Sequence, residues 1–296
     1  MRKLMVVALA AWCVSSLTAA ETKGWGKIDW ATAQTVRAGV QLTHREYETP
    51  RLMKAYFMRV DLKTPGLHFT GMHRDPNWGR PMPDQSNGTI RVRRMTTVHF
   101  ALEERAAGRD LAVAFNANGW TPWCAPWTQH YGDPNALCIT EGVVVCDKLR
   151  ARNDLFVAWA DGTCEIRDGI PSNRWNQAEA CYCGFEIILK NGTSLIAPTR
   201  KEQLHPRTAY GLSADGRYFF ALVVDGRQPG WSLGAEYRDL VRMMLDAGAA
   251  TAINMDGGGS STMIYWDGAR YVPVNRHDPA QRHWRENGGN MGIWFE

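Results

Sequence analysis

The most informative part of the sequence is the stretch 254–262, which reads Asn-Met-Asp-Gly-Gly-Gly-Ser-Ser-Thr. Consecutive glycines let the backbone adopt positive φ and approach a ligand closely, and the successive N–H groups of such a loop form a nest suited to an anion. Asp256 follows an apolar segment, where its carboxylate can serve as acid, base, nucleophile or cation ligand. The same pattern also fits a tight turn closed by an Asx-type hydrogen bond. Because no lysine follows the glycines, it is not a Walker phosphate loop.

The segments around this stretch predict the fold class. Thr251–Met255 predicts a strand that enters the glycines, and Ala235–Ala247 predicts a helix, since its apolar residues recur at helical spacing and Gly248 follows. A second helix is expected within residues 96–108. Further strands are expected at Met53–Leu62, Leu111–Phe115, Leu155–Trp159, Phe185–Leu189 and Tyr218–Val224. The chain is therefore predicted to be α/β (mixed α+β), one domain with a mixed β-sheet flanked by helices.

Two other segments carry groups that bind phosphates and sugars. Residues 205–209, His-Pro-Arg-Thr-Ala, place an arginine beside a hydroxyl group, and an arginine fork suits bidentate binding of phosphate or carboxylate. Residues 225–231, Asp-Gly-Arg-Gln-Pro-Gly-Trp, combine an acid, an arginine, an amide and an aromatic ring after an expected strand. Each segment alone fits a turn or a surface charge. Together with the glycines they supply anion donors, sugar-binding groups and a stacking ring.

The order of these segments carries a resemblance to a known family. Four of them occur in the order found in the phosphodiester glycosidase family: Pro206–Ala209, Asp225–Gly230, Ala235–Gly248 and Asn254–Thr262. Four more are similar to the family's pattern: Leu111–Trp120, Gly184–Gly192, Val274–Arg276 and Asn290–Ile293. The family includes the lysosomal enzyme that removes N-acetylglucosamine from mannose 6-phosphate diesters. The resemblance covers about residues 95–296, and the Asp-Gly-Gly-Gly-Ser-Ser motif is its most specific part.

The sequence departs from the family pattern in one region. The upstream turn reads Asn-Ala-Asn-Gly-Trp at residues 116–120, so Ala117 replaces an expected glycine and one residue is inserted. The following loop, Trp120–Tyr131, is enlarged and contains Trp123, Trp127 and Cys124. Both changes fall where a leaving group or aglycone is expected. They bear on the identity of the substrate more than on the class of reaction.

The resemblance implies a hydrolase that breaks the C1–O bond of a sugar-1-phosphodiester, similar to an N-acetylglucosamine-1-phosphodiester. The phosphate monoester leaves without full protonation, so the enzyme needs mainly phosphate-binding donors and stabilisation of an oxocarbenium-like transition state. Asp256, Arg207 and Asp225 are the predicted catalytic residues, with Asp256 as base for water or as nucleophile. The predicted substrate-binding residues are Asn116, Thr208, Gln228, Trp231, Asn254, Gly257, Gly258, Gly259, Ser260, Ser261 and Asn275.

Several alternatives remain open at this stage. No cofactor is expected, although Asp225 and Asp256 could share a divalent cation such as calcium. Glu186 and Asp256 could form the carboxylate pair of a conventional glycosidase, and Ser260 with a histidine could form a hydrolase triad, although no Gly-x-Ser-x-Gly elbow surrounds it. Outside the enzymes, a secreted carbohydrate-binding protein could use Trp120, Trp123, Trp127 and Trp231 as a platform for an anionic polysaccharide without turnover.

The N-terminus predicts export. Arg2 and Lys3 precede an apolar run, Leu4–Val14, which is followed by small residues up to Ala20. This is the order of a secretory signal peptide at residues 1–20, and the run is too short to span a membrane. The chain is then expected to comprise a β-rich extension at 21–94 and the glycosidase-like part at 95–296, in one domain that is secreted or periplasmic.

Cysteine and charge usage agree with an exported carbohydrate enzyme. Six cysteines follow the signal peptide, and an even number in an exported chain predicts disulfides. The six are Cys124, Cys138, Cys146, Cys164, Cys181 and Cys183. The net charge is +4 without a basic stripe, so a nucleic-acid partner is not expected, and the expected partner is a carbohydrate phosphodiester or an anionic polysaccharide. The sequence does not indicate an oligomeric state.

Overall fold

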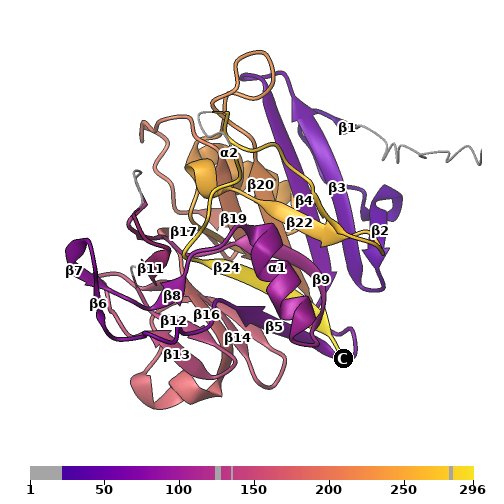
Figure 1. Cartoon of the computed structure of the whole chain (residues 1–296). Coiled ribbons are helices and arrows are strands. Elements are labelled where there is room, and N and C mark those ends of the chain that lie inside the picture. Colours follow the sequence, from indigo (N-terminus) through magenta and orange to yellow (C-terminus); the bar gives the residue numbers. More distant parts are fainter. Residues whose placement is uncertain (1–21, 124–127, 135, 280–282) are drawn as a thin grey trace, which may run out of the picture.

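The structure is a computed structural model of the whole chain and describes residues 22–123, 128–134, 136–279 and 283–296. Its largest element is a nine-stranded sheet (Figure 1) in the order β1-β3-β4-β20-β19-β21-β17-β18, with β2 paired to β3. The strands are β1 (Thr22–Lys23), β2 (Gln34–Arg37), β3 (Val40–Tyr47), β4 (Met53–Asp61), β17 (Glu186–Lys190), β18 (Thr193–Ser194), β19 (Arg207–Leu212), β20 (Tyr218–Val224) and β21 (Thr251–Asn254). Every residue of β20 pairs with a residue of the N-terminal strand β4, from Tyr218 opposite Asp61 to Val224 opposite Ala55. The region before residue 95 therefore builds the same sheet as the C-terminal third.

Two five-stranded sheets complete the framework. One has the order β23-β22-β9-β24-β5, from β5 (Leu67–Gly71), β9 (Asp110–Asn116), β22 (Met263–Trp266), β23 (Tyr271–Pro273) and β24 (Asn290–Phe295). The other has the order β13-β12-β16-β14-β15, from β12 (Cys138–Thr140), β13 (Val143–Cys146), β14 (Asp154–Trp159), β15 (Cys164–Asp168) and β16 (Ala178–Cys183). Smaller pairings join β8 (Val92–Arg93), β10 (Trp120–Thr121) and β11 (Tyr131–Pro134), and join β6 (Pro81–Met82) to β7 (Gln85–Thr89).

The described residues form two α-helices, and the sequence predicted both. Helix α1 (Thr97–Ala106) begins at the cap Thr96, whose side chain accepts a hydrogen bond from the N–H of His99. Helix α2 (Tyr237–Ala247) begins with a reciprocal capping box and ends at Gly248, whose φ of 103° requires a glycine. Short 3₁₀ turns occur at η1 (Trp30–Thr32), η2 (Ser172–Gln177) and η3 (Gly258–Ser260).

The expectation of a sheet flanked by helices overstates the role of the helices, because strands, at 43%, far outnumber helices, at 13%, in the part of the chain that the structure describes. Strand β20 shows the reason. Phe219, Ala221 and Val223 point into a core shared with the two five-stranded sheets, whereas the alternate residues point to α2 on the other face. The central core is thus closed mainly by sheet against sheet. Helix α2 covers only the outer face of the large sheet.

Strand registers place the ends of several strands at one edge of the molecule. Arg207 pairs with Val224, and Asn254 pairs with both Ala209 and Glu186. In the neighbouring sheet, Asn290 pairs with Asn116. The segments that follow β9, β20 and β21 and precede β19 therefore meet at this edge, which carries the glycine stretch.

Candidate active site

The glycine stretch is anchored to the two segments beside it. The N–H of Asp256 donates to the carbonyl of Ala117 (2.9 Å), and the N–H of Gly258 donates to the carbonyl of Pro206 (2.9 Å). A Cβ atom at Gly257 would lie 2.8 Å from the carbonyl oxygen of Pro206, so only glycine permits this approach. These contacts fix the backbone on both sides of the Asp256 carboxylate.

Asn116 is the central link of this arrangement. Its Nδ2 donates to the carbonyl of Asp256 (2.7 Å), while its Oδ1 accepts from the Thr208 hydroxyl (2.7 Å) and the N–H of Thr262 (3.0 Å). Both Asn116 and Thr208 are fully buried and lie outside the pocket lining. Sequence reasoning placed them against the substrate, whereas the structure places them beneath the loop, where they hold Asp256 in position.

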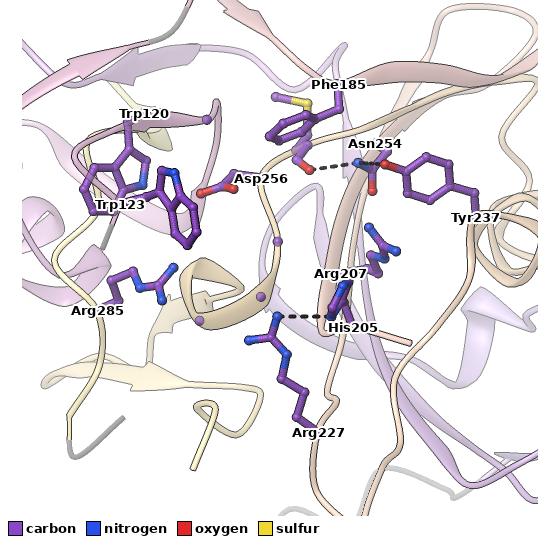
Figure 2. A pocket seen from close by; sticks show the side chains of 15 residues that line it. Trp120, Trp123, Phe185, His205, Arg207, Arg227, Tyr237, Asn254, Asp256 and Arg285 are labelled. Carbon is purple, nitrogen blue, oxygen red and sulfur yellow. Dashed lines mark hydrogen bonds between the residues drawn. The ribbon is translucent and has the colours of Figure 1, made fainter. Parts of the chain in front are cut away.

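An open pocket of about 370 Å³ lies over the glycine stretch (Figure 2). Of the residues predicted from the sequence, Arg207, Asn254, Asp256 and Gly257–Gly259 line it. The other lining residues are Gly119, Trp120, Trp123, Phe185, His205, Arg227, Tyr237, Met255 and Arg285. Figure 2 shows Asp256 between two groups, with Trp120, Trp123 and Arg285 on one side and Arg207, His205 and Arg227 on the other. Aromatic rings and guanidinium groups thus surround one acid.

Asp256 carries the only carboxylate among the described residues that line this pocket. Burial raises its pKa from 3.8 to about 6, although Ser260, the N–H of Gly257, Trp120 and the positive charge of Arg285 all favour the ionised form. The carboxylate is therefore ionised at neutral pH and more basic than an ordinary aspartate. Such a group can accept a proton from water or attack an electrophilic carbon.

The Arg207 guanidinium is held at the base of the pocket by neutral partners. Its Nε donates to the carbonyl of Ala235 (3.1 Å) and its Nη2 to that of Gln203 (3.1 Å), and the group lies over the Tyr237 ring at 4.6 Å. Burial lowers the pKa of Arg207. The two hydrogen bonds to backbone carbonyls fix the guanidinium without neutralising it, so its positive charge acts on the pocket.

Arg227 is oriented differently. Its Nη1 pairs with the buried Asp278 (2.6 Å), and its Nη2 lies 3.1 Å from Nδ1 of His205. Burial, followed by the charges of Arg227 and Arg207, lowers the pKa of His205. This part of the pocket is rich in donors and has a neutral imidazole beside two guanidinium groups.

Asp225 lies outside the lining of the pocket. Its carboxylate is buried and accepts hydrogen bonds from Trp231 Nε1 (2.8 Å), the N–H of Arg276 (2.9 Å), Tyr56 and Asn275. Burial raises its pKa. This aspartate ties three segments of the chain together, and the structure does not bring it and Asp256 into one pocket for a shared cation.

Three predicted substrate-binding residues surround Asp225 rather than the pocket. Lys54 Nζ lies 3.9 Å and the Arg276 guanidinium 4.5 Å from the centre of the Trp231 ring, so both cations contact the predicted stacking surface. Asn275 donates to the carbonyl of Ser261 (3.0 Å) and accepts from the N–H of Met263 (2.9 Å). Gln228 is buried and donates to the carbonyl of His277 (3.4 Å).

The predicted anion nest is largely engaged within the protein. The N–H groups of Ser260 and Ser261 donate to the carbonyls of Gly257 and Gly258, and that of Gly258 donates to Pro206. Ser260 and Ser261 are also buried. These backbone donors are therefore not free for a phosphate, and the positive groups of the pocket are the arginine side chains.

Several lining residues were not among the predicted site residues. His205 and Arg227 stand inside the motifs that the sequence singled out, and Trp120 and Trp123 were assigned to the binding-platform alternative. Tyr237 begins α2, and its hydroxyl accepts from Asn254 Nδ2 (3.2 Å). Arg285 stands in a polar segment without a recognisable pattern, so no sequence signal distinguishes it from a surface arginine.

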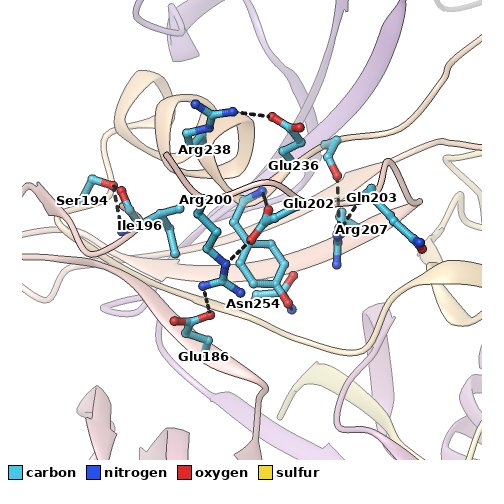
Figure 3. Close-up of polar contacts among 12 residues, drawn as sticks. Glu186, Ser194, Ile196, Arg200, Glu202, Gln203, Arg207, Glu236, Arg238 and Asn254 are labelled. Atoms are coloured by element: carbon cyan, nitrogen blue, oxygen red, sulfur yellow. Dashed lines mark hydrogen bonds and ion pairs between the residues drawn. The ribbon is translucent and has the colours of Figure 1, made fainter. Parts of the chain in front are cut away.

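The structure disfavours the conventional glycosidase pair. Glu186 lies outside the pocket lining and pairs with Arg200 (2.7 Å) and Arg152 (3.8 Å). Figure 3 shows Arg200 between Glu186 and Glu202, next to the segment that holds Arg207. Glu186 is therefore part of an ion-pair network. The Ser260 alternative likewise lacks support, because Ser260 is buried and interacts with Asp256.

The metal and disulfide expectations concern other parts of the chain. Within the described ranges one group, His73, Glu104 and Glu141, brings three ligand atoms within 4.8 Å, and Arg109 already pairs with both of its glutamates. The five described cysteines are free thiols, so the structure does not show the predicted disulfides. Cys124, Trp127 and the predicted signal peptide lie outside the described residues. No helix in the described ranges has the length and apolar character needed to cross a membrane.

Comparison with known proteins identifies the family. The profile of the phosphodiester glycosidase family matches residues 114–288, which include every residue of the pocket. The chain belongs to the phosphodiester glycosidase family. A search of curated proteins found no match.

Three solved structures share the fold of this member of the family. The catalytic domain of zebrafish N-acetylglucosamine-1-phosphodiester alpha-N-acetylglucosaminidase, auto-inhibited by its pro-peptide, is 18% identical, with a TM-score of 0.59 over 89% of this chain and 87% of that one. A putative exported protein from Burkholderia pseudomallei is 14% identical, with a TM-score of 0.54 over 82% and 74%. A hypothetical protein from Synechocystis is 11% identical, with a TM-score of 0.54 over 88% and 62%. At these identities the likeness concerns the fold.

Proposed function

We propose that this protein is an exported hydrolase that cleaves the glycosidic C1–O bond of a sugar-1-phosphodiester, of the N-acetylglucosamine-1-phosphodiester type, releasing the free sugar and a phosphomonoester. The observation that carries the proposal is the composition of the pocket: a single carboxylate, Asp256, lies between aromatic rings and guanidinium groups. Membership in the phosphodiester glycosidase family supports a glycosidase-type activity. Export rests on the N-terminal sequence.

A single carboxylate suits this reaction because of the leaving group. Ordinary glycosidases use two carboxyl groups, one of which protonates the departing sugar oxygen. A phosphate monoester departs as an anion and requires charge neutralisation rather than a proton. Arg207 and Arg227 lie on one side of Asp256 and provide positive charge for the phosphate. One carboxylate and several guanidinium groups among the described lining residues therefore suit a substrate with this leaving group.

The sugar is expected on the aromatic side of Asp256. Trp120 and Trp123 lie there, and Trp123 is 60% exposed, so its ring is available for stacking against a sugar. In this arrangement Asp256 faces C1, either taking a proton from the attacking water or attacking C1 itself. Overall, the C1–O bond to the phosphate oxygen breaks and a C1–O bond to the water oxygen forms, with one proton of that water kept on the new sugar hydroxyl and the other released to solvent, through Asp256 where it acts as the base. If Asp256 attacks C1, a bond from C1 to the carboxylate forms as the phosphomonoester leaves, and water then replaces the carboxylate at C1.

The test is turnover on a panel of N-acetylhexosamine- and hexose-1-phosphodiesters, with free reducing sugar and phosphomonoester measured together. We expect equimolar products from the wild type and loss of both with Asp256→Asn and Arg207→Ala. Asp215→Asn and Arg217→Ala, at the other end of β20, serve as matched controls and should retain activity. Hydrolysis in ¹⁸O-water should label the sugar, and label in the phosphate would contradict C1–O cleavage.

The stereochemistry of the first product separates the two roles of Asp256. Retention of the anomeric configuration indicates a covalent intermediate on the carboxylate, whereas inversion indicates a base that activates water. Binding of these diesters without turnover by the wild type would instead favour the carbohydrate-binding alternative.

A further inference from the structure

His205 occupies a position whose backbone is fixed by close packing. The N–H of Ala235 donates to the His205 carbonyl (3.0 Å). A Cβ atom at Gly234 would lie 2.7 Å from that oxygen, and one at Gly226 would lie 2.8 Å from the His205 carbonyl carbon. Both glycines are therefore needed for the backbone to pass His205 so closely. The imidazole is therefore attached to a fixed segment of backbone, and it lines the pocket.

The hydrogen bond from Arg227 determines the protonation state of this imidazole. Arg227 Nη2 lies 3.1 Å from Nδ1 of His205. A guanidinium group has donors but no acceptor and stays protonated in proteins, so Nδ1 must offer its lone pair. An imidazole that accepts at Nδ1 is neutral and carries its proton on Nε2. A carboxylate in the place of Arg227 would have the opposite effect.

Asp278 fixes Arg227 from the other side. Its carboxylate, whose side chain is 1% exposed, receives Arg227 Nη1 at 2.6 Å. Because Nη1 pairs with this acid while Nη2 faces His205, the guanidinium is held in one orientation. Asp278, Arg227 and His205 thus form a chain that runs from a buried carboxylate to the pocket (Figure 2 shows its last two members).

Arg227 has an unfavourable backbone conformation. The φ of Arg227 is 59°, a left-handed conformation that residues other than glycine rarely adopt. Such a conformation persists only where the surrounding structure enforces it, and it is common at functional sites. Gly258 also makes room for the side chain, since a Cβ atom there would lie 3.3 Å from Arg227 Nη2. The positive φ of Arg227 and the absence of a side chain at Gly258 together allow the guanidinium to occupy this place.

We propose that the Asp278–Arg227–His205 chain holds His205 as a neutral imidazole that donates its Nε2–H to an oxygen of a phosphoryl group bound in the pocket. The phosphoryl part of this inference rests on the proposed function, whereas the state of the imidazole rests on geometry alone. His205 is then a substrate-binding residue, and Arg227 and Asp278 are positioning residues for it.

The surrounding charges agree with a neutral ring. Arg227 and Arg207 disfavour an imidazolium and, together with burial, outweigh the opposing effect of Asp278. The other charged groups that line the pocket are Asp256 and Arg285. A neutral donor binds phosphate oxygens equally well across neutral and mildly acidic pH. It also holds the dianionic phosphomonoester product less tightly than an imidazolium would, which favours product release.

The state of the ring can be observed directly by long-range ¹H–¹⁵N correlation NMR of the histidine side chains, with His205→Gln for assignment. We expect His205 to be the neutral Nε2–H form at neutral pH in the wild type, because burial and the two guanidinium groups lower its pKa. In Arg227→Met its pKa should rise, because the charge of Arg227 no longer opposes the imidazolium, while burial and Arg207 still lower it. Arg217→Met, a surface arginine paired with Asp61, is the matched control and should leave His205 unchanged. An imidazolium or an Nδ1–H form in the wild type would overturn the proposal.

The phosphoryl contact is tested with inorganic phosphate and with the diester panel. Phosphate should shift the Nε2 resonance of His205. His205→Ala should lower kcat/KM by about 10²-fold, the usual effect of losing one preorganised donor, and His205→Gln, which keeps an N–H donor, should recover most of it. Absence of both effects would refute the phosphoryl contact. If no diester is turned over, the proposed function fails, while the NMR titration still decides the state of His205.

Discussion

Asp225 and Asp256 look alike in the sequence and differ in the structure. Each follows an apolar central strand of the same sheet, and each is followed by glycine. Asp225 accepts four hydrogen bonds and lies outside the pocket, whereas Asp256 lies in the pocket with a pKa of about 6. Burial raises the pKa of both carboxylates, but that of Asp225 is engaged between segments of the chain whereas that of Asp256 lines the pocket. The difference shows that the partners of a strand-end acid, rather than its position in the motif, decide what it can do.

The strongest test of this difference between Asp225 and Asp256 is to remove each charge in turn and measure turnover. Asp256→Asn should lower kcat on the best diester by about 10³-fold or more, because no other described carboxylate lines the pocket. Asp225→Asn should affect kcat far less in molecules that remain folded. Equal losses of kcat in two folded variants would show that Asp225 acts in the reaction.

Both carboxylates have a raised pKa, so the stability of each variant tests whether burial of the charge or the hydrogen bonds to it contribute more. The pKa of Asp256 is raised in the folded protein, so its ionisation costs stability as the pH rises from about 4 through 6. Asp256→Asn should therefore raise the free energy of unfolding at pH 8 by up to about 3 kcal/mol, with little effect at pH 4. Urea unfolding at both pH values measures this, and a gain of equal size at pH 4 would contradict the electrostatic cause.

Asp225→Asn should destabilise the protein by about 1–3 kcal/mol at pH 8. Trp231 donates to one carboxylate oxygen and the N–H of Arg276 to the other, so the amide NH₂ of asparagine faces a donor in either orientation. The same urea experiments test this. An unchanged free energy of unfolding would show that the hydrogen-bonded connection between these segments contributes nothing net.

The smallest expected effect is a shift in the pH dependence of turnover when Arg285 is replaced. With Asp256 acting as an ionised group, kcat/KM should fall tenfold per pH unit below about pH 6 and level off above it. Arg285 lowers the pKa of Asp256 by its charge, so Arg285→Met should move this limb to higher pH by a fraction of a unit. If the acidic part of the pH–rate profile moved to lower pH instead, its assignment to Asp256 would be wrong.

Much of the framework could be predicted from the sequence because its local signals are strong. The helical spacing and the glycine stop predicted α2 to within two residues of its start, and β20 was predicted with its observed bounds, Tyr218–Val224. Local patterns do not report which strands pair, however. The sheet-on-sheet core therefore appeared only in the structure, and the role of the helices was overstated.

The sequence predicted the pocket residues Asp256, Arg207 and Gly257–Gly259, but it did not predict the roles of the residues around them. Asp256, Arg207 and the glycines lie in motifs whose composition already points to chemistry. Asn116 and Asn275 have the same residue types, yet their side chains turn inward to pair with backbone groups far away in the sequence. That orientation depends on tertiary packing, so no spacing rule reveals it.

The link through Asn116 divides the site into parts that can change independently. Asn116, Thr208 and Thr262 hold Asp256 from the inside, whereas Arg285 and the exposed Trp123 stand at the rim of the pocket. A library that randomises the rim while keeping the buried amide should thus sample new substrate preferences without displacing the reactive group. Natural divergence can follow the same route, with the inner asparagine constant and the outer wall free to vary.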